Sequence, residues 1–423
     1  GYPEFLLTMD YRTDFPVRGL LVDKKYGHVL KMDRYKYVKK AYHGLRPLDL
    51  EERRKLYHSK RLRPETKRYH WVDTLYALSE VAVYAATIDA MEAQGKPVDY
   101  GKLFADVREC IDLSHQDGSI LDVVLADMPQ YIHRDERLPQ TLHKLRSAGK
   151  RLFVLTNSRA AYTEKIMSYL LDGALPGYTH WKHYFDVVIT ASKKPRFFDR
   201  REPFVEILGD GSEVPAKALE RGRVYAGGNL RDFEKIVGVP ADRILYVGDH
   251  IFGDVLRAKK ETAWRTAMIL QEMDQEMEAY LRSAGDHNHL DSLTETRVAH
   301  YQELQAQQSH LKEITKKVDA YKLEGKRIPT DLDGDRVVTR KNVERLRTQV
   351  KILEEEINAL EDRIDEAFHP FWGSLLKAGP EKSSFGNQVE TYACLYTDRV
   401  SNFFEYSPHH YFRSPRDRMP HEF

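Results

Sequence analysis

The spacing of apolar side chains changes along the chain, and each change marks a different kind of predicted structure. Over residues 1–45, short apolar stretches such as Phe5-Leu6-Leu7 alternate with turn formers, which predicts short strands and hairpins. Over 46–134 the apolar positions recur every three or four residues, as in amphipathic helices. Over 135–296, short runs that are apolar throughout alternate with helical stretches. That alternation predicts a parallel sheet covered on both faces.

An uninterrupted apolar seam follows over residues 297–367. Its apolar residues step by three and four through two arms, and the turn-rich stretch 325–335 separates the arms. This pattern predicts an antiparallel helical hairpin with a coiled-coil seam. We expect the hairpin to mediate self-association or to shield the globular body, so a homo-oligomer is expected. Residues 368–423 are expected to pack back on the α/β core.

Charge and cysteine content exclude several classes of protein. The 423 residues carry 66 Lys+Arg and 65 Asp+Glu, a net charge of +1, which argues against a globally basic nucleic-acid binder. No apolar run approaches the roughly 18 residues that a membrane helix needs. Two cysteines, Cys110 and Cys394, are too few for a disulfide framework or a four-thiolate zinc site. A cytoplasmic protein that binds neither nucleic acid nor membrane is expected.

The strongest chemical motif is the strand-to-loop sequence at 244–254, Ile-Leu-Tyr-Val-Gly-Asp-His-Ile-Phe-Gly-Asp. Strands of a parallel sheet present their carboxyl ends to the ligand crevice, where Asp249 would hold Mg²⁺. Gly248 and Gly253 have the spacing of a phosphate loop, but Asp254 occupies the position where such a loop requires Lys. The nucleoside-triphosphatase interpretation therefore fails, and an aspartate that caps a helix remains the structural alternative.

Two further strand ends carry groups that suit a phosphate. Thr156, Asn157 and Ser158 follow a buried strand. The hydroxyl of Thr156 or Ser158 and the backbone N–H groups of the next helix start could donate to a phosphate, although such a triplet is also an ordinary helix cap. Lys194 follows the strand at 187–190 and could neutralise a phosphate, although most Lys-Lys pairs are simply solvated. The order of the three strand ends in one α/β stretch favours a shared site.

This order resembles the haloacid dehalogenase superfamily, and in detail the cytosolic purine 5′-nucleotidases of the IMP/GMP-specific type. The resemblance runs nearly from end to end. The motifs that carry it are Gly1-Tyr2-Pro3, Phe15-Pro16-x-Arg18-Gly19-Leu20, Leu30-Lys31-Met32-Asp33, Thr156-Asn157-Ser158, Tyr162-Thr163-x-Lys165-Ile166-Met167, Tyr184-Phe185-Asp186, Lys194-Pro195-x-Phe197-Phe198, Tyr225-x-Gly227-Gly228, Gly248-Asp249-His250-Ile251-Phe252-Gly253-Asp254 and Met419-Pro420-His421-Glu422.

The resemblance implies a fold and a mechanism. The fold is a haloacid dehalogenase-like Rossmannoid parallel sheet, with a mainly helical cap inserted between the first and second signatures. The mechanism is Mg²⁺-dependent attack on a phosphate by an aspartate, which forms an aspartyl-phosphate that water hydrolyses. Four residues receive roles by resemblance: Thr156 as the phosphate-binding hydroxyl, with Asn157 and Ser158 beside it, Lys194 as the third-signature lysine, Asp249 as the metal ligand and Asp254 as a supporting carboxylate.

The resemblance also assigns residues that read the nucleotide. Arg108 and Asp112 match an arginine and an aspartate of the family's cap, and they lie four apart on a predicted helix, so both can project from one face. An ordinary surface ion pair, worth about 0.3–0.5 kcal/mol, is the alternative interpretation of that spacing.

The chain departs from the family at its nucleophile. The Asp-x-Asp-x-Thr signature is absent, and two imitations fail, because Arg12 stands two residues after Asp10 and Lys25 two residues after Asp23. We expect the signature upstream of Gly1. Arg159 and Leu121 also replace an expected Asp and Lys, which bears on the fine substrate preference.

The sequence thus predicts an enzyme that hydrolyses purine nucleoside 5′-monophosphates, with phosphate transfer to a nucleoside as an added activity. Two alternatives remain: a phosphatase of the same fold with another substrate, and a non-catalytic scaffold that uses the hairpin to bind partners.

Overall fold

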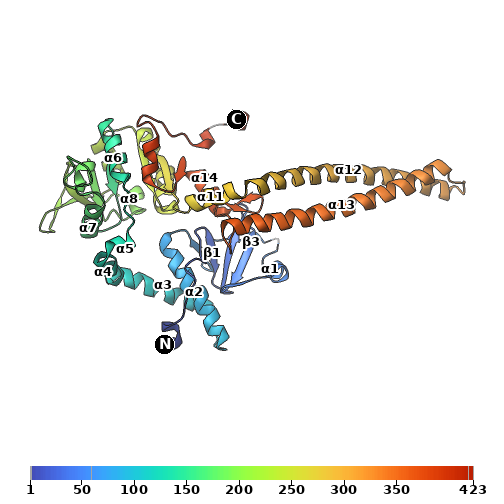
Figure 1. Ribbon diagram of the computed structural model, residues 1–423, viewed down its shortest axis with the longest axis horizontal. Helices are drawn as coiled ribbons and strands as arrows, with labels where there is room; N and C mark the ends of the chain where they lie inside the picture. Colours follow the sequence, from blue (N-terminus) through green and yellow to red (C-terminus); the bar gives the residue numbers. More distant parts are fainter. Residues whose placement is uncertain (1, 59, 418, 423) are drawn as a thin grey trace. The chain divides into compact units, whose positions relative to one another are not determined.

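The computed structural model describes residues 2–58, 60–417 and 419–422. The chain divides into two compact units, one formed by Gly1–Asp274 with Leu375–Phe423 and the other by Gln275–Ser374 (Figure 1). Over the described ranges, no helix combines the length and apolar character needed to cross a bilayer.

The first unit begins with a five-stranded antiparallel sheet in the order β4-β3-β2-β1-β5. Leu21 of β1 faces Leu30 on one side and Trp71 on the other, and its side chain is fully buried. The apolar stretch at 5–7 is not a strand, because Glu4–Leu7 forms a 3₁₀ turn in which Leu7 is 83% exposed. The strands of this sheet are β1 (Leu20–Asp23), β2 (His28–Met32), β3 (Val38–His43), β4 (Arg46–Pro47) and β5 (Tyr69–Val72).

Helices follow and pack beside this sheet. Thr74 caps α2 by accepting from the N–H of Ala77 at 3.1 Å, and Asp99 caps α3 by accepting from the N–H of Lys102 at 3.0 Å. The segment 46–134, expected to be a helical cap, is mainly helical, but it also contributes β4 and β5 to the sheet of the first 45 residues. The helices are α1 (Leu50–Tyr57), α2 (Leu75–Ala93), α3 (Tyr100–Gln116), α4 (Ser119–Ala126) and α5 (Met128–Tyr131).

Apart from the two-stranded β13–β14 ribbon, the strands described in the α/β part of the first unit form two sheets instead of the one parallel sheet that the sequence predicts. One has the order β6-β7-β10-β8-β9, parallel through β10 and antiparallel beyond it, and the other has the parallel order β11-β12-β15. The elements are α6 (Leu138–Ser147), β6 (Phe153–Leu155), α7 (Ala160–Leu171), β7 (Val187–Thr190), α8 (Arg196–Asp199), β8 (Phe204–Ile207), β9 (Glu213–Pro215), β10 (Val224–Gly227), α9 (Leu230–Val237), β11 (Leu245–Gly248), α10 (Arg257–Glu261), β12 (Arg265–Ile269), β13 (Lys377–Ala378), β14 (Glu381–Lys382), α14 (Ser384–Tyr392) and β15 (Leu395–Thr397).

The single-sheet prediction is wrong because pairing between distant strands is not encoded in a local apolar run. The segment between β7 and β10 turns back at 208–212, so β8 and β9 form a hairpin that gives the first sheet an antiparallel edge. The α/β class itself is confirmed, with mixed sheets.

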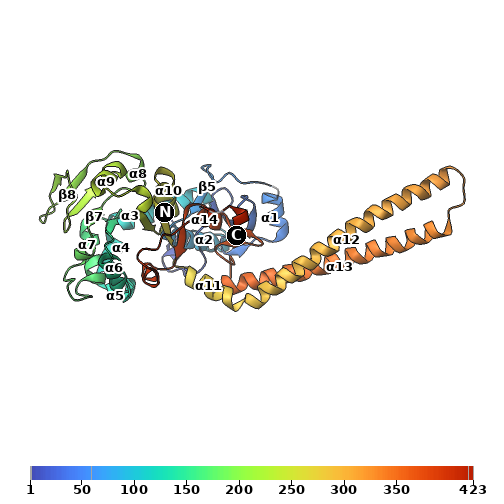
Figure 2. The same cartoon turned by 90° about the horizontal axis from the view of Figure 1, so that it is seen from above.

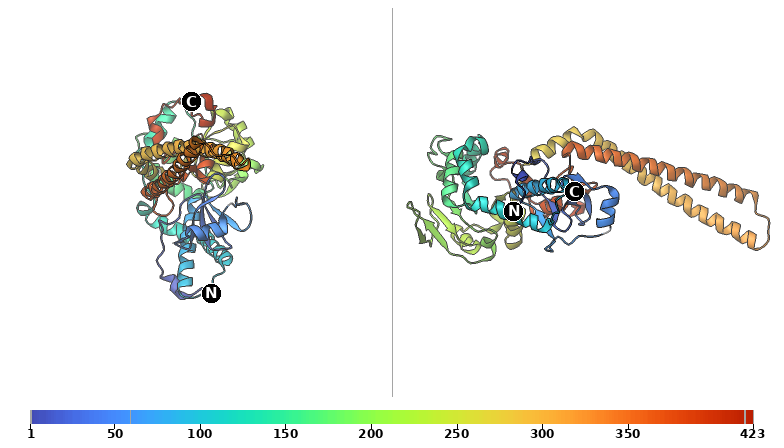
Figure 3. Two further views of the ribbon diagram at one scale, coloured as in Figure 1. Left: turned by 90° about the vertical axis from the view of Figure 1, so that its right-hand side faces the viewer. Right: turned by 90° about the horizontal axis from the view of Figure 1, so that it is seen from below.

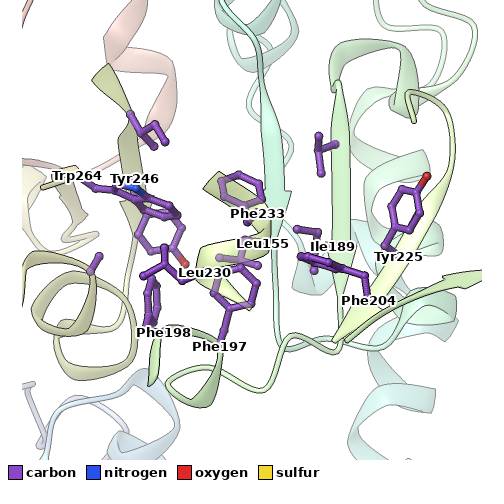
Figure 4. Packing of buried hydrophobic residues seen from close by; sticks show 13 residues of the cluster. Leu155, Ile189, Phe197, Phe198, Phe204, Tyr225, Leu230, Phe233, Tyr246 and Trp264 are labelled. Carbon is purple, nitrogen blue, oxygen red and sulfur yellow. The ribbon is translucent and has the colours of Figure 1, made fainter. Parts of the chain in front are cut away.

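One aromatic core joins the two sheets (Figure 4). Phe153 of β6 stacks on Tyr246 of β11 with ring centroids 6.3 Å apart and an interplanar angle of 6°. Trp264 is fully buried and meets Tyr246 edge-on at 5.7 Å. The carboxyl ends of β6, β7 and β11 are thereby held in one neighbourhood.

The second unit is a helical hairpin. Two helices, α12 (Ala284–Leu323) and α13 (Thr330–Phe368), lie side by side and are joined by a short turn (Figures 2 and 3). Leu304, Val343 and Leu346 are buried against one another along the seam. Helix α12 begins before residue 297, where the sequence predicts the hairpin to begin, and α11 (Met273–Arg282) leads into it. A coiled-coil supercoil stays a prediction.

Candidate active site

Asn157 fixes the backbone that carries Lys194. The Asn157 Oδ1 accepts from the Lys194 N–H at 2.6 Å and from the Ser192 hydroxyl at 3.0 Å, and its Nδ2 donates to the Lys194 carbonyl at 3.0 Å. The loop needs such support, because Ala191 and Lys193 have φ angles of 43° and 56°, in the left-handed region that non-glycine residues rarely adopt. Both ends of the Asn157 amide are thus used to place the lysine.

The Lys194 amine lies in a nearly closed polar cluster. Its Nζ donates to Asp254 Oδ1 at 2.7 Å, to the Tyr246 hydroxyl oxygen at 2.9 Å and to the Leu155 carbonyl at 2.9 Å. The Tyr246 hydroxyl donates to the same Asp254 oxygen at 2.9 Å. Burial and the nearby Asp254 charge hold the pKa of Tyr246 well above its usual range, so the hydroxyl keeps its proton. We call Thr156, Lys194, Tyr246 and Asp254 the strand-end cluster.

Local sequence explains how Asp254 reaches the lysine. A Cβ at Gly248 would lie 2.6 Å from the Asp254 Cβ, so only glycine can end β11 at this point. The π-helical turn Ile251–Leu256 then carries Asp254 back over the strand end. His250 caps that turn, because its Nδ1 accepts from the N–H groups of Phe252 and Gly253 at 3.1 and 3.0 Å. The capping aspartate considered as an alternative is therefore not the residue that caps this turn.

Thr156 lies directly beyond the carbonyl that Lys194 binds. Its Oγ1 accepts from the Ser158 N–H at 3.1 Å, and its backbone carbonyl accepts from the Ser192 N–H at 3.0 Å. Among the residues that the structure describes, the Thr156 hydroxyl donates to none, so its proton is available to a ligand.

Asp249 is held by its backbone and leaves its carboxylate exposed. The carbonyl of Asp249 accepts from Arg18 at 3.0 Å, and Arg18, only 2% exposed, also makes a two-bond ion pair with Glu272 whose Nε–Oε1 distance is 2.8 Å. The Asp249 carboxylate forms no hydrogen bond or ion pair with any residue in the described ranges.

The donor set around Asp249 fits Mg²⁺ only with substrate present. Among the described residues, no three side chains of His, Cys, Asp or Glu gather to form a ready-made metal cage. Mg²⁺ is commonly held by one or two carboxylates with phosphate oxygens and waters. Asp249 supplies one free carboxylate, whereas Asp254 is engaged by Lys194 and Tyr246.

Arg108 and Asp112 lie at a different place in the first unit. Both line a cavity of about 560 Å³ along α3. The Arg108 Nε lies 3.6 Å from Glu80 Oε1, and its Nη1 lies 3.4 Å from His70 Nδ1. Glu80 is 5% exposed and its Oε2 has no hydrogen-bond partner in the described chain. The predicted alternative, an ion pair between Arg108 and Asp112, is not formed within those residues. We call this space, with Arg108 and Asp112 in its lining, the α3 cavity; Glu80 contacts Arg108 but is not among the lining residues.

The carboxylate of Asp73 is influenced by charges from both the α3 cavity and the Asp249 loop. Burial raises the pKa of Asp73, while the charges of His250 and Arg108 both act to lower it. Asp73 therefore lies within electrostatic reach of both regions. No hydrogen bond or ion pair joins Arg108 or Asp112 to the strand-end cluster among the described residues.

Several residues of the site carry no sequence signal. From the sequence alone, Tyr246 is only a strand residue and Glu80 is only a helix residue. Arg18 belongs to a motif, but the sequence does not show its partner. Asp23, which imitates a nucleophile in the sequence, is instead fully buried and accepts from the Tyr57 hydroxyl at 2.8 Å and from Arg68 Nε at 2.7 Å.

Comparison with known proteins shows which protein family the chain belongs to. The sequence profile described as "5′ nucleotidase family" matches residues 1–423, so the chain belongs to this family. Among curated proteins, a 5′-nucleotidase domain-containing protein of Dictyostelium discoideum is 27% identical over the whole chain. The human and rat proteins named 5′-nucleotidase domain-containing protein 2 are each 31% identical over 73% of the chain. The matches cover 67%, 61% and 58% of the lengths of these three relatives, respectively.

Proposed function

We propose that the protein is a haloacid dehalogenase-type phosphohydrolase that removes phosphate from purine nucleoside 5′-monophosphates in a Mg²⁺-dependent reaction. The observation that carries the proposal is the strand-end cluster together with the neighbouring Asp249, which bring a lysine, two hydroxyls and two carboxylates from the ends of β6, β7 and β11 into one neighbourhood. Family membership supports a nucleotide as the substrate class.

Each residue of the cluster has a part in this proposal. Thr156 donates its hydroxyl proton to a phosphate oxygen, and Lys194 offsets negative charge there while Asp254 and Tyr246 hold its amine in place. A bound Mg²⁺ would supply charge neutralisation for the phosphate, with Asp249 as its protein ligand.

The nucleophile is proposed to be an aspartate on a strand outside these 423 residues. Within the described chain, β6 and β11 are each the last strand of their sheet on the sides joined by Phe153 and Tyr246, which leaves both edges free of a strand partner. In the proposed reaction, a carboxylate oxygen bonds to phosphorus as the bond to the nucleoside oxygen breaks. Water then releases inorganic phosphate from the aspartyl-phosphate, and a nucleoside hydroxyl in place of water would give phosphotransfer.

Purine recognition is assigned to the α3 cavity. Arg108 can donate to a base carbonyl, and Asp112 can accept from a base N–H, so the pair suits a 6-oxopurine such as that of IMP or GMP.

The complete gene product tests the proposal by phosphate release from a panel of monophosphates. We expect turnover of IMP and GMP that requires Mg²⁺, and loss of that turnover in Asp249→Asn with the fold retained by circular dichroism. Full activity in Asp249→Asn would contradict the metal-ligand role. Equal turnover of sugar phosphates would contradict the purine assignment and favour a phosphatase with another substrate. If none of the monophosphates is hydrolysed, the result would favour the non-catalytic scaffold.

A further inference from the structure

Positive and negative charges are unevenly distributed along the chain, although they almost cancel over its whole length. Residues 31–63 carry 12 of the 66 Lys+Arg but only 4 of the 65 Asp+Glu, so 54 Lys+Arg and 61 Asp+Glu remain elsewhere. The expectation that the protein binds no nucleic acid rests on the overall balance, and that balance does not describe this basic stretch. The fold determines which of its cations share one surface.

The turn between β2 and β3 presents two exposed tyrosines from this basic stretch. Tyr35 and Tyr37 are 49% and 40% exposed, respectively. The Oδ1 atom of the buried Asp33 accepts from the N–H of Tyr35 at 2.9 Å and from the N–H of Tyr37 at 3.0 Å. Lys36 between them has a φ angle of 71°, in the left-handed region that is costly for a residue other than glycine. A buried carboxylate thus holds a strained turn, and both rings are placed before any ligand binds.

A second segment of the basic stretch places two cations beside this turn. The Leu62 N–H donates to the Lys36 carbonyl at 3.1 Å, so the segment after α1 lies against the middle of the turn. Leu62 is buried in an apolar cluster with residues of β1, β2 and β3. The residues on either side of it, Arg61 and Arg63, are exposed. Burial of the leucine therefore leaves both guanidiniums on the solvent side, next to the turn that carries the two tyrosine rings.

The polar and aromatic groups of this surface retain binding capacity. The guanidiniums of Arg61 and Arg63 form no hydrogen bond or ion pair with any residue in the described ranges. In the same ranges, the Tyr37 ring contacts no other aromatic ring and no cation. The Tyr35 ring is contacted by Arg34, whose guanidinium lies 4.7 Å from the ring centroid. We call Tyr35, Tyr37, Arg61 and Arg63 the turn surface.

We propose that the turn surface binds a single-stranded polynucleotide. Unpaired bases stack on tyrosine rings with little sequence preference, and guanidiniums beside the rings neutralise the phosphates that link those bases. A duplex keeps its bases stacked inside, and an acidic polypeptide would use the arginines but not the rings. None of the four residues lines the α3 cavity or belongs to the strand-end cluster, so the proposal does not depend on hydrolysis there.

Fluorescence anisotropy tests the proposal, with the complete gene product and a labelled oligouridylate of about ten nucleotides that carries no terminal phosphate. We expect saturable binding that weakens about tenfold in Tyr35→Leu/Tyr37→Leu, because two stacking rings are lost. Tyr35→Phe/Tyr37→Phe keeps both rings and should bind like the parent protein. The matched control is Tyr131→Leu/Tyr396→Leu, which removes two tyrosines that are 50% and 45% exposed. An equal loss in both leucine variants, or no saturable binding to the parent protein, would overturn the proposal.

The salt dependence of the same binding tests the two arginines. In Arg61→Gln/Arg63→Gln, the slope of log Kd against log salt concentration should fall by about 1.4, since each phosphate contact on a single strand contributes about 0.7. The tyrosine variants should leave this slope unchanged. The matched control is Arg345→Gln/Arg347→Gln, which removes the same charge from two exposed arginines of α13 that also lack an ion pair in the described ranges. Equal changes of slope in both arginine variants would overturn the proposal.

Competition with unlabelled polymers distinguishes a polynucleotide strand from other anionic partners. We expect oligouridylate or oligothymidylate to displace the labelled strand, because stacking on tyrosine does not depend on the sugar. Polyglutamate of the same charge should displace it much less. Equal displacement by polyglutamate would overturn the proposal and indicate an acidic polypeptide as the partner. Equal displacement by a duplex of the same length would also overturn it, because the bases of a duplex are not free to stack on the two rings.

Discussion

The strand-end cluster and the α3 cavity differ in how completely their polar groups are satisfied. In the cluster, Lys194 makes three hydrogen bonds of 2.7–2.9 Å, and the buried Asp254 receives two of the donors around it. At the cavity, Arg108 lies 3.4–3.6 Å from its partners, and one buried oxygen of Glu80, the carboxylate beside Arg108, has no hydrogen-bond partner among the described residues.

The difference distinguishes side chains that are already held in place by hydrogen bonds from side chains whose hydrogen-bonding capacity is not fully used. A buried polar atom without a hydrogen bond is costly, so it is expected where a ligand completes the bonding. The cluster needs no ligand to be ordered, as the proposed phosphate chemistry requires of a preorganised site. The cavity retains hydrogen-bonding capacity, as recognition of a base requires.

The largest expected effect concerns the buried pair of the cluster. Lys194→Met leaves Asp254 buried without its ion-pair partner, and we expect the free energy of unfolding to fall by about 3–5 kcal/mol. Urea denaturation measures this change in the free energy of unfolding. The control is Lys193→Met, because Lys193 pairs with Glu202 at 2.9 Å on the surface and its loss should change stability little. Similar small losses of unfolding free energy in both variants would contradict the prediction, because the buried ion pair would then stabilise the protein no more than the surface pair does.

The next effect concerns the residue that holds the Asp249 loop. Arg18→Met removes a buried pair with Glu272 and the bond to the Asp249 carbonyl, so we expect a loss of about 2–3 kcal/mol in unfolding free energy. In the complete gene product it should also raise the Mg²⁺ concentration needed for half-maximal activity. Arg18→Lys should recover part of both effects, and Arg12→Met, which removes an exposed pair, should change neither. An unchanged Mg²⁺ requirement would restrict Arg18 to a structural role.

The α3 cavity should be the more acid-sensitive of the two regions. Burial, together with the charges of Arg108 and Lys24, lowers the pKa of His70 to about 4 from its ordinary 6.5. As the pH falls, the unfolded chain binds this proton first, so stability present above pH 6.5 is lost between pH 6.5 and about 4. Allowing for partial exposure, we expect about 1–2 kcal/mol. His70→Gln should flatten that part of the stability curve, whereas His58→Gln, at an exposed site, should not. Identical curves for all three proteins would contradict the prediction.

The smallest expected effect tests whether Glu80 positions Arg108. Glu80→Gln removes the negative charge beside the guanidinium but keeps the side-chain volume. We expect the KM for the purine monophosphate to rise about tenfold, or about 1.4 kcal/mol, with kcat unchanged. The control is Glu109→Gln, because Glu109 lines the cavity but forms no ion pair with Arg108 among the described residues. A fall in kcat without a change in KM would instead place Glu80 in the chemistry.

The strand-end cluster could be expected from sequence because parallel strands bring their carboxyl ends to one edge. That rule alone predicts that Thr156 and Lys194 lie close together, although it does not predict the two-sheet arrangement. Tyr246 could not be assigned, since its role arises only when Lys194 arrives from a strand 52 residues away. Arg18 is similar, because its partner Glu272 lies 254 residues further along.

Three lysines at the shared end of β1 and β5, Lys24, Lys25 and Lys67, show the same limit. Lys24 and Lys25 look like part of a failed nucleophile motif in the sequence, and Lys67 like an ordinary loop residue. Only the register of β1 with β5 makes them neighbours, and register depends on the whole sheet.

The hairpin unit leaves and rejoins the chain at nearly one point. The Ser374 hydroxyl donates to Glu276 Oε2 at 2.8 Å, so the beginning and end of an inserted segment of about one hundred residues lie within a single hydrogen bond of each other. Such an insertion can grow or shrink by whole helical turns without stretching the segments that flank it. Its length is therefore free to diverge among relatives while the catalytic scaffold stays constant, and a short glycine bridge between Asp274 and Leu375 would be a natural way to excise it.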